Sequence, residues 1–164
     1  MIATIGVSGH TDGMTASADP EFEVRYGLEP ERIAQLLDLY AGEWWTATRT
    51  AADVERMLTA SDVVVALVSR ADDRLVAFAR ALTDDAYVAL VLDVIVAADR
   101  RREGLGATLM DAILRHPRLA GVASVELTCR EGLVAFYRRF GFTDQVGGSR
   151  LMRRTSDTRL TGPA

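Results

Sequence analysis

Arginine and glycine residues are concentrated between a β-branched run and a helix-like run in the second half of the chain. Val94–Val96 is apolar and β-branched, Arg101–Gly106 is basic and rich in glycine, and Ala107–Leu114 has helical apolar spacing. This order predicts a strand, a loop and a helix. The first N–H groups of a helix lack partners within it, and with the helix dipole they form a site for an anion such as phosphate. The alternative is a glycine-containing turn with a solvated arginine face.

The predicted anion site combines backbone donors with positive charge. Gly104 and Gly106 have no Cβ, so a phosphate can approach the backbone closely. Glu103 lies among these residues, and its negative charge should point away from a bound anion. The predicted anion-binding residues are Arg101, Arg102, Gly104, Leu105, Gly106 and Ala107.

Two other phosphate motifs are excluded. A P-loop requires Gly-Lys-Ser or Gly-Lys-Thr, and this chain contains no lysine. A dinucleotide fingerprint requires Gly-x-Gly-x-x-Gly at the first strand–helix turn. Here only the shorter Gly104-Leu105-Gly106 occurs, past the middle of the chain.

Two segments resemble the GNAT superfamily of acyl-CoA-dependent N-acetyltransferases. Arg101–Gly106 matches the family's Arg-x-x-Gly-x-Gly pyrophosphate motif, and Leu133–Phe142 is similar to its Phe-Tyr-x-x-x-Gly-Phe element. The resemblance covers Glu21–Arg154. It implies acetyl-CoA as the acyl-donor substrate and an amine as the acceptor, with direct transfer in a ternary complex.

The resemblance also implies how the donor is held and which group acts on it. In the family, the fourth and fifth strands splay apart to admit the pantetheine arm; here they are Tyr87–Val96 and Val122–Thr128. Val94, Ile95 and Val96 would then bind coenzyme A through their main chain, and a backbone N–H would stabilise the oxyanion. Tyr137 occupies the position of the general acid that protonates the leaving thiolate. Its alternative role is packing beside neighbouring phenylalanines.

Asp93 is the predicted general base, directly or through a water. It is the one carboxylate within the apolar run of its strand, so burial should raise its pKa. The alternative is a hydrogen-bonded structural acid. Glu126 and Glu43 are weaker candidates for the base.

Glu43, Trp44 and Trp45 are the predicted acceptor-binding residues. They lie between the first two helices, which often border the acceptor in GNAT enzymes. Adjacent side chains on a helix face different directions, so one tryptophan is expected to pack inward and the other to be exposed. A role in the core for both is the alternative. No metal site is expected, because His10 and His116 are few and far apart, and Cys129 is expected to be a buried structural thiol.

Periodicity and turn residues predict alternating strands and helices that position these residues. The resemblance to the GNAT superfamily implies how these elements assemble: an α/β (α+β) fold with a mixed, mostly antiparallel sheet whose splayed fourth and fifth strands are flanked by helices. The predicted strands are Phe22–Tyr26, Val63–Val68, Leu75–Leu82, Tyr87–Val96, Val122–Thr128, one from Phe142 onward and Arg150–Arg154. The predicted helices are Ala51–Thr59, Gly104 to about Arg115, Glu131–Phe140, and one that begins at Pro30.

Composition is typical of one globular domain. The chain has 164 residues, 49% hydrophobic and 26% charged, and a net charge of −4, which argues against a general nucleic-acid binder. We expect a mobile tail over residues 1–20, a single GNAT domain over 21–155 and a frayed end over 156–164, with Met14 as an alternative start.

The sequence further indicates where the protein acts and with what. Its single cysteine suits a reducing compartment such as the cytoplasm, and no signal peptide, membrane segment or membrane partner is expected. The expected partner is a small-molecule or peptide amine, and a homodimer is left open. A non-catalytic acyl-CoA-binding sensor or scaffold is the main alternative function, and an O-acyltransferase is a third.

Overall fold

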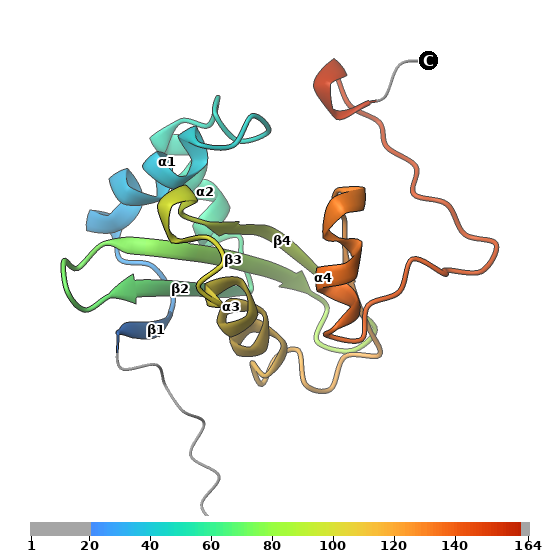
Figure 1. Ribbon diagram of the computed structural model, residues 1–164. Coiled ribbons are helices and arrows are strands. Elements are labelled where there is room, and N and C mark those ends of the chain that lie inside the picture. Colours follow the sequence, from blue (N-terminus) through green and yellow to red (C-terminus); the bar gives the residue numbers. More distant parts are fainter. Residues whose placement is uncertain (1–20, 162–164) are drawn as a thin grey trace, which may run out of the picture.

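One five-stranded sheet organises residues 21–161, the part of the chain that this computed structural model describes. The predicted tail over residues 1–20 lies outside the described residues. The strands follow the order β1-β2-β3-β4-β5, with three antiparallel pairings and a parallel one between β4 and β5 (Figure 1). They are β1 Phe22–Tyr26, β2 Val63–Ser69, β3 Leu75–Thr83, β4 Val88–Val96 and β5 Ser124–Leu127.

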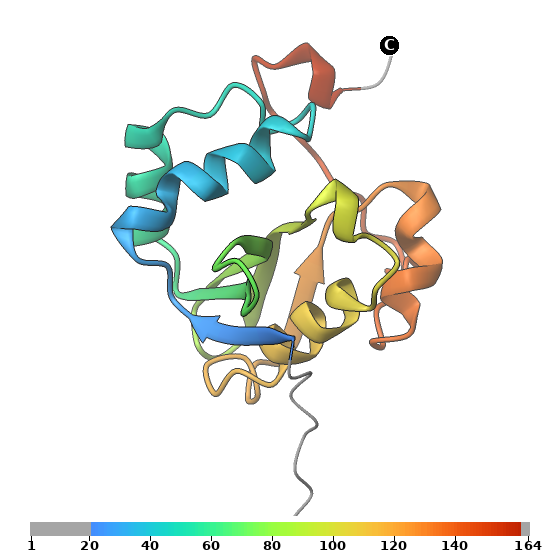
Figure 2. The ribbon, with the colours of Figure 1, turned by 60° about the vertical axis from the view of Figure 1, so that its left-hand side comes forward.

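Helices cover both faces of the sheet, which confirms the predicted fold class (Figure 2). On one face lie α1 Ile33–Ala41, which follows the 3-10 turn η1 Pro30–Arg32, and α2 Ala51–Thr59. On the other lie α3 Leu105–Leu114 and, beside it, α4 Val134–Arg138, which follows η3 Glu131–Leu133. None of the helices within residues 21–161 is long and apolar enough to cross a membrane.

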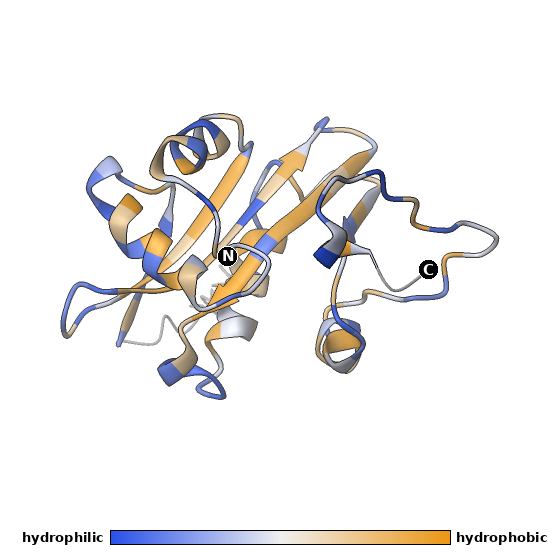
Figure 3. Cartoon of the chain, turned by 90° about the horizontal axis from the view of Figure 1, so that it is seen from above, coloured by the Kyte–Doolittle hydropathy of each residue, from blue (hydrophilic) through white to orange (hydrophobic). Residues whose placement is uncertain are grey.

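Each face of the sheet has its own hydrophobic core. The apolar colour of the central strands, between more polar helix surfaces, is visible in Figure 3. Leu36 and Tyr40, one helical turn apart on α1, pack with Phe78 on the α1–α2 face. Leu109 and Ile113 of α3 fill the opposite face. Burial of these periodic residues holds the helices on the sheet.

Strand β4 contains a bulge at Asp93. Phe78 of β3 pairs with Ile95, whereas Arg80 pairs with Leu92, so β4 carries one additional residue between these pairs. Asp93 has a φ of 55°, the left-handed region that is uncommon for a residue within a strand. The bulge turns the carboxylate of Asp93 toward the α1–α2 face, where it meets Tyr40.

Strands β4 and β5 pair at one end only. Their register runs from Val88 opposite Ser124 to Val91 opposite Leu127, and β4 continues to Val96 without β5 beside it. This separation agrees with the splayed fourth and fifth strands that the family resemblance implied.

The two predicted C-terminal strands are wrong for the described part of the chain, up to residue 161. Neither the segment after Phe142 nor Arg150–Arg154 pairs with the sheet, and the only regular element there is the 3-10 turn η4 Thr158–Leu160. The segment stands away from the labelled strands of the sheet (Figure 1), and Arg159 donates to the carbonyl oxygen of Trp44 at 3.3 Å. The segment therefore returns to the α1–α2 loop, and β5 is an edge strand.

Candidate functional site

Unpaired backbone donors lie at the start of α3. Gly104 precedes the helix with a φ of 86°, and no side chain caps it. Ala107 and Thr108 donate their N–H groups to the carbonyl of Gly104 at 2.8 and 3.1 Å. The N–H groups of Gly104, Leu105 and Gly106 have no acceptor among the hydrogen bonds of residues 21–161. This is the geometry of an anion site at a helix N-terminus.

Gly106 lies where β4, α3 and α4 meet. A Cβ at this position would be 3.4 Å from Cζ of Phe136 and 3.9 Å from Cγ2 of Val96. Any larger side chain would press on both neighbours. The glycine thus lets the start of α3 lie close to the end of β4 and to α4.

Ion pairs hold the loop before α3 in place. Asp99 pairs with Arg74 of the β2–β3 turn at 2.6 Å, and Arg100 pairs with Glu21 at 2.6 Å and with Glu103 at 2.7 Å. The carboxylate of Glu103 is therefore engaged by Arg100. Because these pairs are largely exposed, they fix the loop conformation more than they add stability.

The two arginines predicted to bind an anion are placed differently. Arg101 pairs with Glu43 and donates from Nε to the carbonyl of Val96 at 3.3 Å, so its guanidinium lies at the open edge of β4. Arg102 is exposed and has a φ of 71°. The sequence did not indicate the Arg101–Glu43 pair, because the two residues are 58 positions apart.

The end of β4 offers main-chain groups to the gap beside β5. Ala97 donates its N–H to Val76 at 2.8 Å, on the β3 side. Because successive strand residues point their N–H groups to opposite sides, the N–H of Val96 faces the gap. The side chains of Val94 and Val96 pack on the α3 face, and that of Ile95 packs on the α1–α2 face.

Tyr137 lies on α4 within the α3-side core. Its ring packs against Phe136 and Phe142, with centroids 5.0 and 6.0 Å away. Burial, together with the nearby thiol of Cys129, raises the pKa of Tyr137 to about 12. The hydroxyl is therefore protonated at neutral pH, the form a proton donor needs.

The expected rise in the pKa of Asp93 is wrong. Burial alone would raise it, but the hydrogen bonds and charges of Arg49 and Arg80 outweigh burial, and the pKa lies below its ordinary value. Arg49 donates to both carboxylate oxygens at 2.7 and 2.9 Å, and Arg80 donates from Nε at 2.7 Å. A carboxylate held ionised in this way is a poor general base, so its geometry favours the alternative structural role.

Trp44 and Trp45 point in different directions, as predicted. Trp45 packs on the α1–α2 core beside Arg49, whereas Trp44 is 45% exposed, with Cζ of Arg130 5.5 Å from its ring. Cys129 is half-buried, and burial, with a smaller effect of Asp144, raises the pKa of its thiol. It is thus a thiol rather than a thiolate nucleophile.

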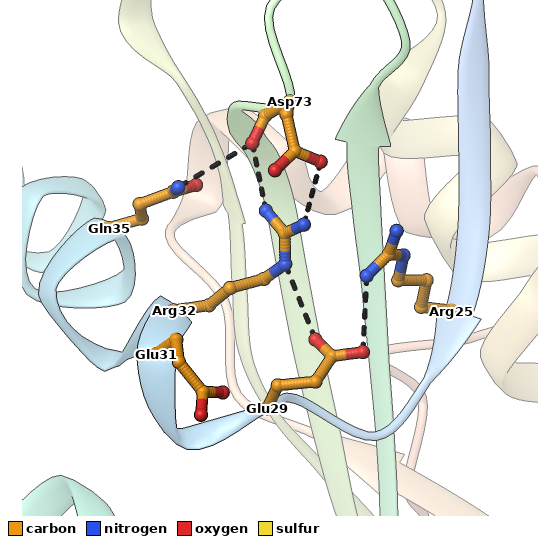
Figure 4. A pocket seen from close by; sticks show the side chains of 6 residues that line it. All are labelled: Arg25, Glu29, Glu31, Arg32, Gln35 and Asp73. Atoms are coloured by element: carbon orange, nitrogen blue, oxygen red, sulfur yellow. Dashed lines mark hydrogen bonds and ion pairs between the residues drawn. The ribbon is translucent and has the colours of Figure 1, made fainter.

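A second polar region lies between β1, η1, α1 and the β2–β3 turn (Figure 4). Arg32 pairs with Glu29 at 3.3 Å and with Asp73 at 2.7 Å, and Arg25 also pairs with Glu29, at 3.1 Å. These charges neutralise one another and fasten α1 to the turn. The region shares no residue with the α3 loop, and Nε of Arg25 is a buried donor without a hydrogen-bond partner among the described residues.

Comparison with known proteins decides the family. The profile of the acetyltransferase (GNAT) family matches residues 31–142, a segment that contains the α3 loop, β4, β5 and α4. The chain belongs to the GNAT family. Proteins named N-acetyltransferases are among its relatives, so the activity of the family is acetyl transfer.

The relatives match part of their own length. The uncharacterized N-acetyltransferase ycf52 of Porphyra purpurea is 31% identical over 97 residues, which are 58% of this chain and 56% of that protein. The chloroplastic GCN5-related N-acetyltransferase 1 of Arabidopsis thaliana is 28% identical over 127 residues, 77% of this chain and 64% of the relative. The chain thus spans between about half and two thirds of these relatives.

Solved structures share the fold. A Xanthomonas campestris protein assigned to the GNAT family as an acetyltransferase is 30% identical with a TM-score of 0.67, and the match covers 81% of this chain and 93% of that one. Glucosamine-6-phosphate N-acetyltransferase of Arabidopsis thaliana has a TM-score of 0.68 at 18% identity, with 83% and 99% covered. The second likeness concerns the fold alone.

Proposed function

We propose that this protein transfers an acetyl group from acetyl-CoA directly to an amine within a ternary complex. The observation that carries this proposal is the loop at the start of α3, whose free N–H groups lie beside the gap between β4 and β5. A pyrophosphate at the loop would direct the rest of a coenzyme along β4. Family membership supports the choice of acyl donor.

The loop residues would bind the pyrophosphate. The N–H groups of Gly104, Leu105 and Gly106 donate to phosphate oxygens, and the exposed Arg102 adds charge. Ala107 lies in the first helical turn, where its N–H bonds the carbonyl of Gly104 and helps to hold the loop. Arg101 orders the loop from its position between Glu43 and Val96.

The main chain of β4 would bind the pantetheine amides and the thioester. Val96 offers its N–H to the gap, where no strand competes for it. An N–H aimed at the thioester oxygen would stabilise the negative charge that develops when the amine attacks. Tyr137 would then donate its proton to the departing sulfur, as its protonated state allows. The amine, which attacks as the free base, would release a proton to solvent as the amide forms, and the Tyr137 phenolate would take up a proton before the next turnover.

The acceptor would enter from the α1–α2 side, near Glu43 and Trp44. It is proposed to be a small-molecule or peptide amine, with no nucleic acid and no membrane as partner. A reducing compartment such as the cytoplasm suits the free thiol of Cys129, although the Arabidopsis relative is named as chloroplastic. Light scattering decides between a monomer and the homodimer that the sequence leaves open.

A substitution at Gly106 tests the donor site. Gly106→Val places branches against Phe136 and Val96 and displaces the start of α3, so acetyl-CoA should bind at least about tenfold more weakly. Isothermal titration calorimetry measures the affinity. Gly121→Val is the matched control, because a Cβ there meets nothing within 4 Å. Unchanged affinity in a folded Gly106→Val protein would contradict the donor site.

A further inference from the structure

Two guanidinium groups share one carboxylate between the sheet and the α1–α2 layer. Arg49 and Arg80 both donate to Asp93, whose side chain is only 3% exposed. The hydroxyl of Tyr40 lies 3.2 Å from the same carboxylate, and burial, reinforced by the charge of Asp93, raises its pKa and keeps it neutral. Two positive charges thus face one negative charge.

No other described residue neutralises the remaining charge. The further hydrogen-bond partners are the sulfur of Met57, for Arg49, and the hydroxyl of Ser61, for Arg80. No second carboxylate within residues 21–161 forms an ion pair with either arginine. The rings of Tyr40 and Trp45 lie 4.5 and 5.9 Å from Cζ of Arg49, and they stabilise the cation without cancelling its charge.

Each of the two arginines has a guanidinium nitrogen without a hydrogen-bond partner among the described residues. Nε of Arg49 and Nη2 of Arg80 take part in no hydrogen bond within the described part of the chain. The two side chains are 25% and 12% exposed, so solvent or a ligand reaches them while bulk screening is reduced. This arrangement favours an anion whose oxygen atoms accept hydrogen bonds from both arginines.

The cluster lies beside the gap in the sheet. Asp93 belongs to the part of β4 that continues beyond Val91, the last residue paired with β5. Its side chain is on the α1–α2 face, whereas the loop at Gly104 and the ring of Phe136 belong to the α3 side. A donor bound on the α3 side leaves the α1–α2 side to the acceptor.

We propose that the acceptor is an amine that also carries an anionic group, a carboxylate or a phosphate, and that Arg49 and Arg80 bind this group. The inference rests on the proposed function and names the class of its second substrate. The uncompensated charge attracts such an acceptor and repels polycationic amines.

Matched acceptors test this inference directly. Tyrosine against tyramine and tryptophan against tryptamine differ only in a carboxylate, and phosphoethanolamine against ethanolamine differs in a phosphate. With acetyl-CoA as donor, kcat/KM should favour the anionic member of at least one pair by about tenfold or more. The carboxylate and phosphate pairs show which anion is recognised. Added salt should reduce the preference.

Charge variants show whether the arginines cause the preference. Arg49→Met makes the cluster neutral and should bring the preference close to unity, and Arg80→Met offers the same test if the first variant does not fold. Arg56→Met, which removes an exposed arginine paired with Asp53 on α2, should leave the preference unchanged. Melting temperature and acetyl-CoA affinity verify that each variant is folded.

The outcomes separate the two proposals. The anionic acceptor is overturned if all amines are acetylated without preference. It is also overturned if folded Arg49→Met and Arg56→Met proteins prefer anionic acceptors equally. Either result leaves the proposal of acetyl transfer intact. Absence of coenzyme A release with every amine, despite acetyl-CoA binding, overturns the proposed function itself and the acceptor class with it.

Discussion

Tyr137, whose hydroxyl is the proposed proton donor, is only 7% exposed. Tyr137→Phe retains the ring beside Phe136 and Phe142 but removes the proton, so turnover should fall by about 10²–10⁴-fold. Acetyl-CoA affinity should change little, because the hydroxyl acts mainly as charge develops on sulfur. Steady-state kinetics with calorimetry measures both.

A control for this prediction is Tyr87→Phe, since Tyr87 is exposed and outside the site. If chemistry is the slow step and Tyr137→Phe still turns over at nearly the rate of the unsubstituted protein, another group supplies the proton to the leaving thiolate. Because the pKa of Tyr137 is raised to about 12, its ionisation should not limit turnover below about pH 10.

Asp93 is predicted to contribute to stability rather than to proton transfer. Asp93→Asn leaves Arg49 and Arg80 without their charge partner in a mostly buried setting, and should cost about 3–5 kcal/mol in the free energy of unfolding at pH 7. Urea denaturation measures this value. Asp53→Asn, at an exposed ion pair, is the control and should cost less than about 1 kcal/mol.

The pH dependence of this effect has a definite sign. The pKa of Asp93 is lower in the folded protein than in the unfolded chain, so its contribution is fully present above the unfolded value of about 4. It is lost as the pH falls through the folded pKa. The stability difference between the unsubstituted protein and Asp93→Asn should therefore shrink below about pH 4, and a difference independent of pH would contradict the ionised carboxylate.

Local elements were predicted well where the pattern itself specifies them. The apolar spacing after Thr50 predicted Ala51–Thr59, the observed α2, and Thr50 caps it by accepting the N–H of Asp53. The apolar run after Gly104 likewise predicted α3. The predicted helix Glu131–Phe140 is shorter in the structure, where a 3-10 turn precedes α4.

Features that depend on distant partners were not predicted. Arg49 lies in a loop, without a motif, and meets Asp93 across 44 residues. The rise expected for the pKa of Asp93 followed from burial alone and omitted these arginines. The C-terminal strands were predicted from local alternation, but a strand also needs a neighbour, and the segment after Phe142 has none in the described part of the chain.

The C-terminal segment gives a prediction at the scale of elements. Leu151 and Met152 are 70% and 87% exposed and pack on no core. Changing both to serine should therefore shift the free energy of unfolding by less than about 0.5 kcal/mol. Leu109→Ala, at a fully buried residue of α3, should cost about 2–5 kcal/mol by the same denaturation assay. A large loss for the double variant would place the segment on the sheet.

At the scale of the whole molecule, the two proposals assign separate tasks to the two faces of the sheet. The free donors of the Gly104 loop are at the start of α3, and Tyr137 lies in the core of the same face. The α1–α2 face presents the Arg49–Arg80–Asp93 cluster. Pairing of β4 with β5 ends at Val91 and Leu127, and the proposals imply that a donor on one face and an acceptor on the other meet beyond this point.

Direct transfer is tested by one experiment on the intact protein. With acetyl-CoA alone, intact-protein mass spectrometry should detect no covalent acetyl-enzyme, because Cys129 is held as a thiol and the amine is the nucleophile. Addition of a carboxylate- or phosphate-bearing amine should release one coenzyme A thiol for each acetylated amine formed. Binding of acetyl-CoA without thiol release from any amine would contradict catalysis and establish instead a domain that binds acyl-CoA without turnover.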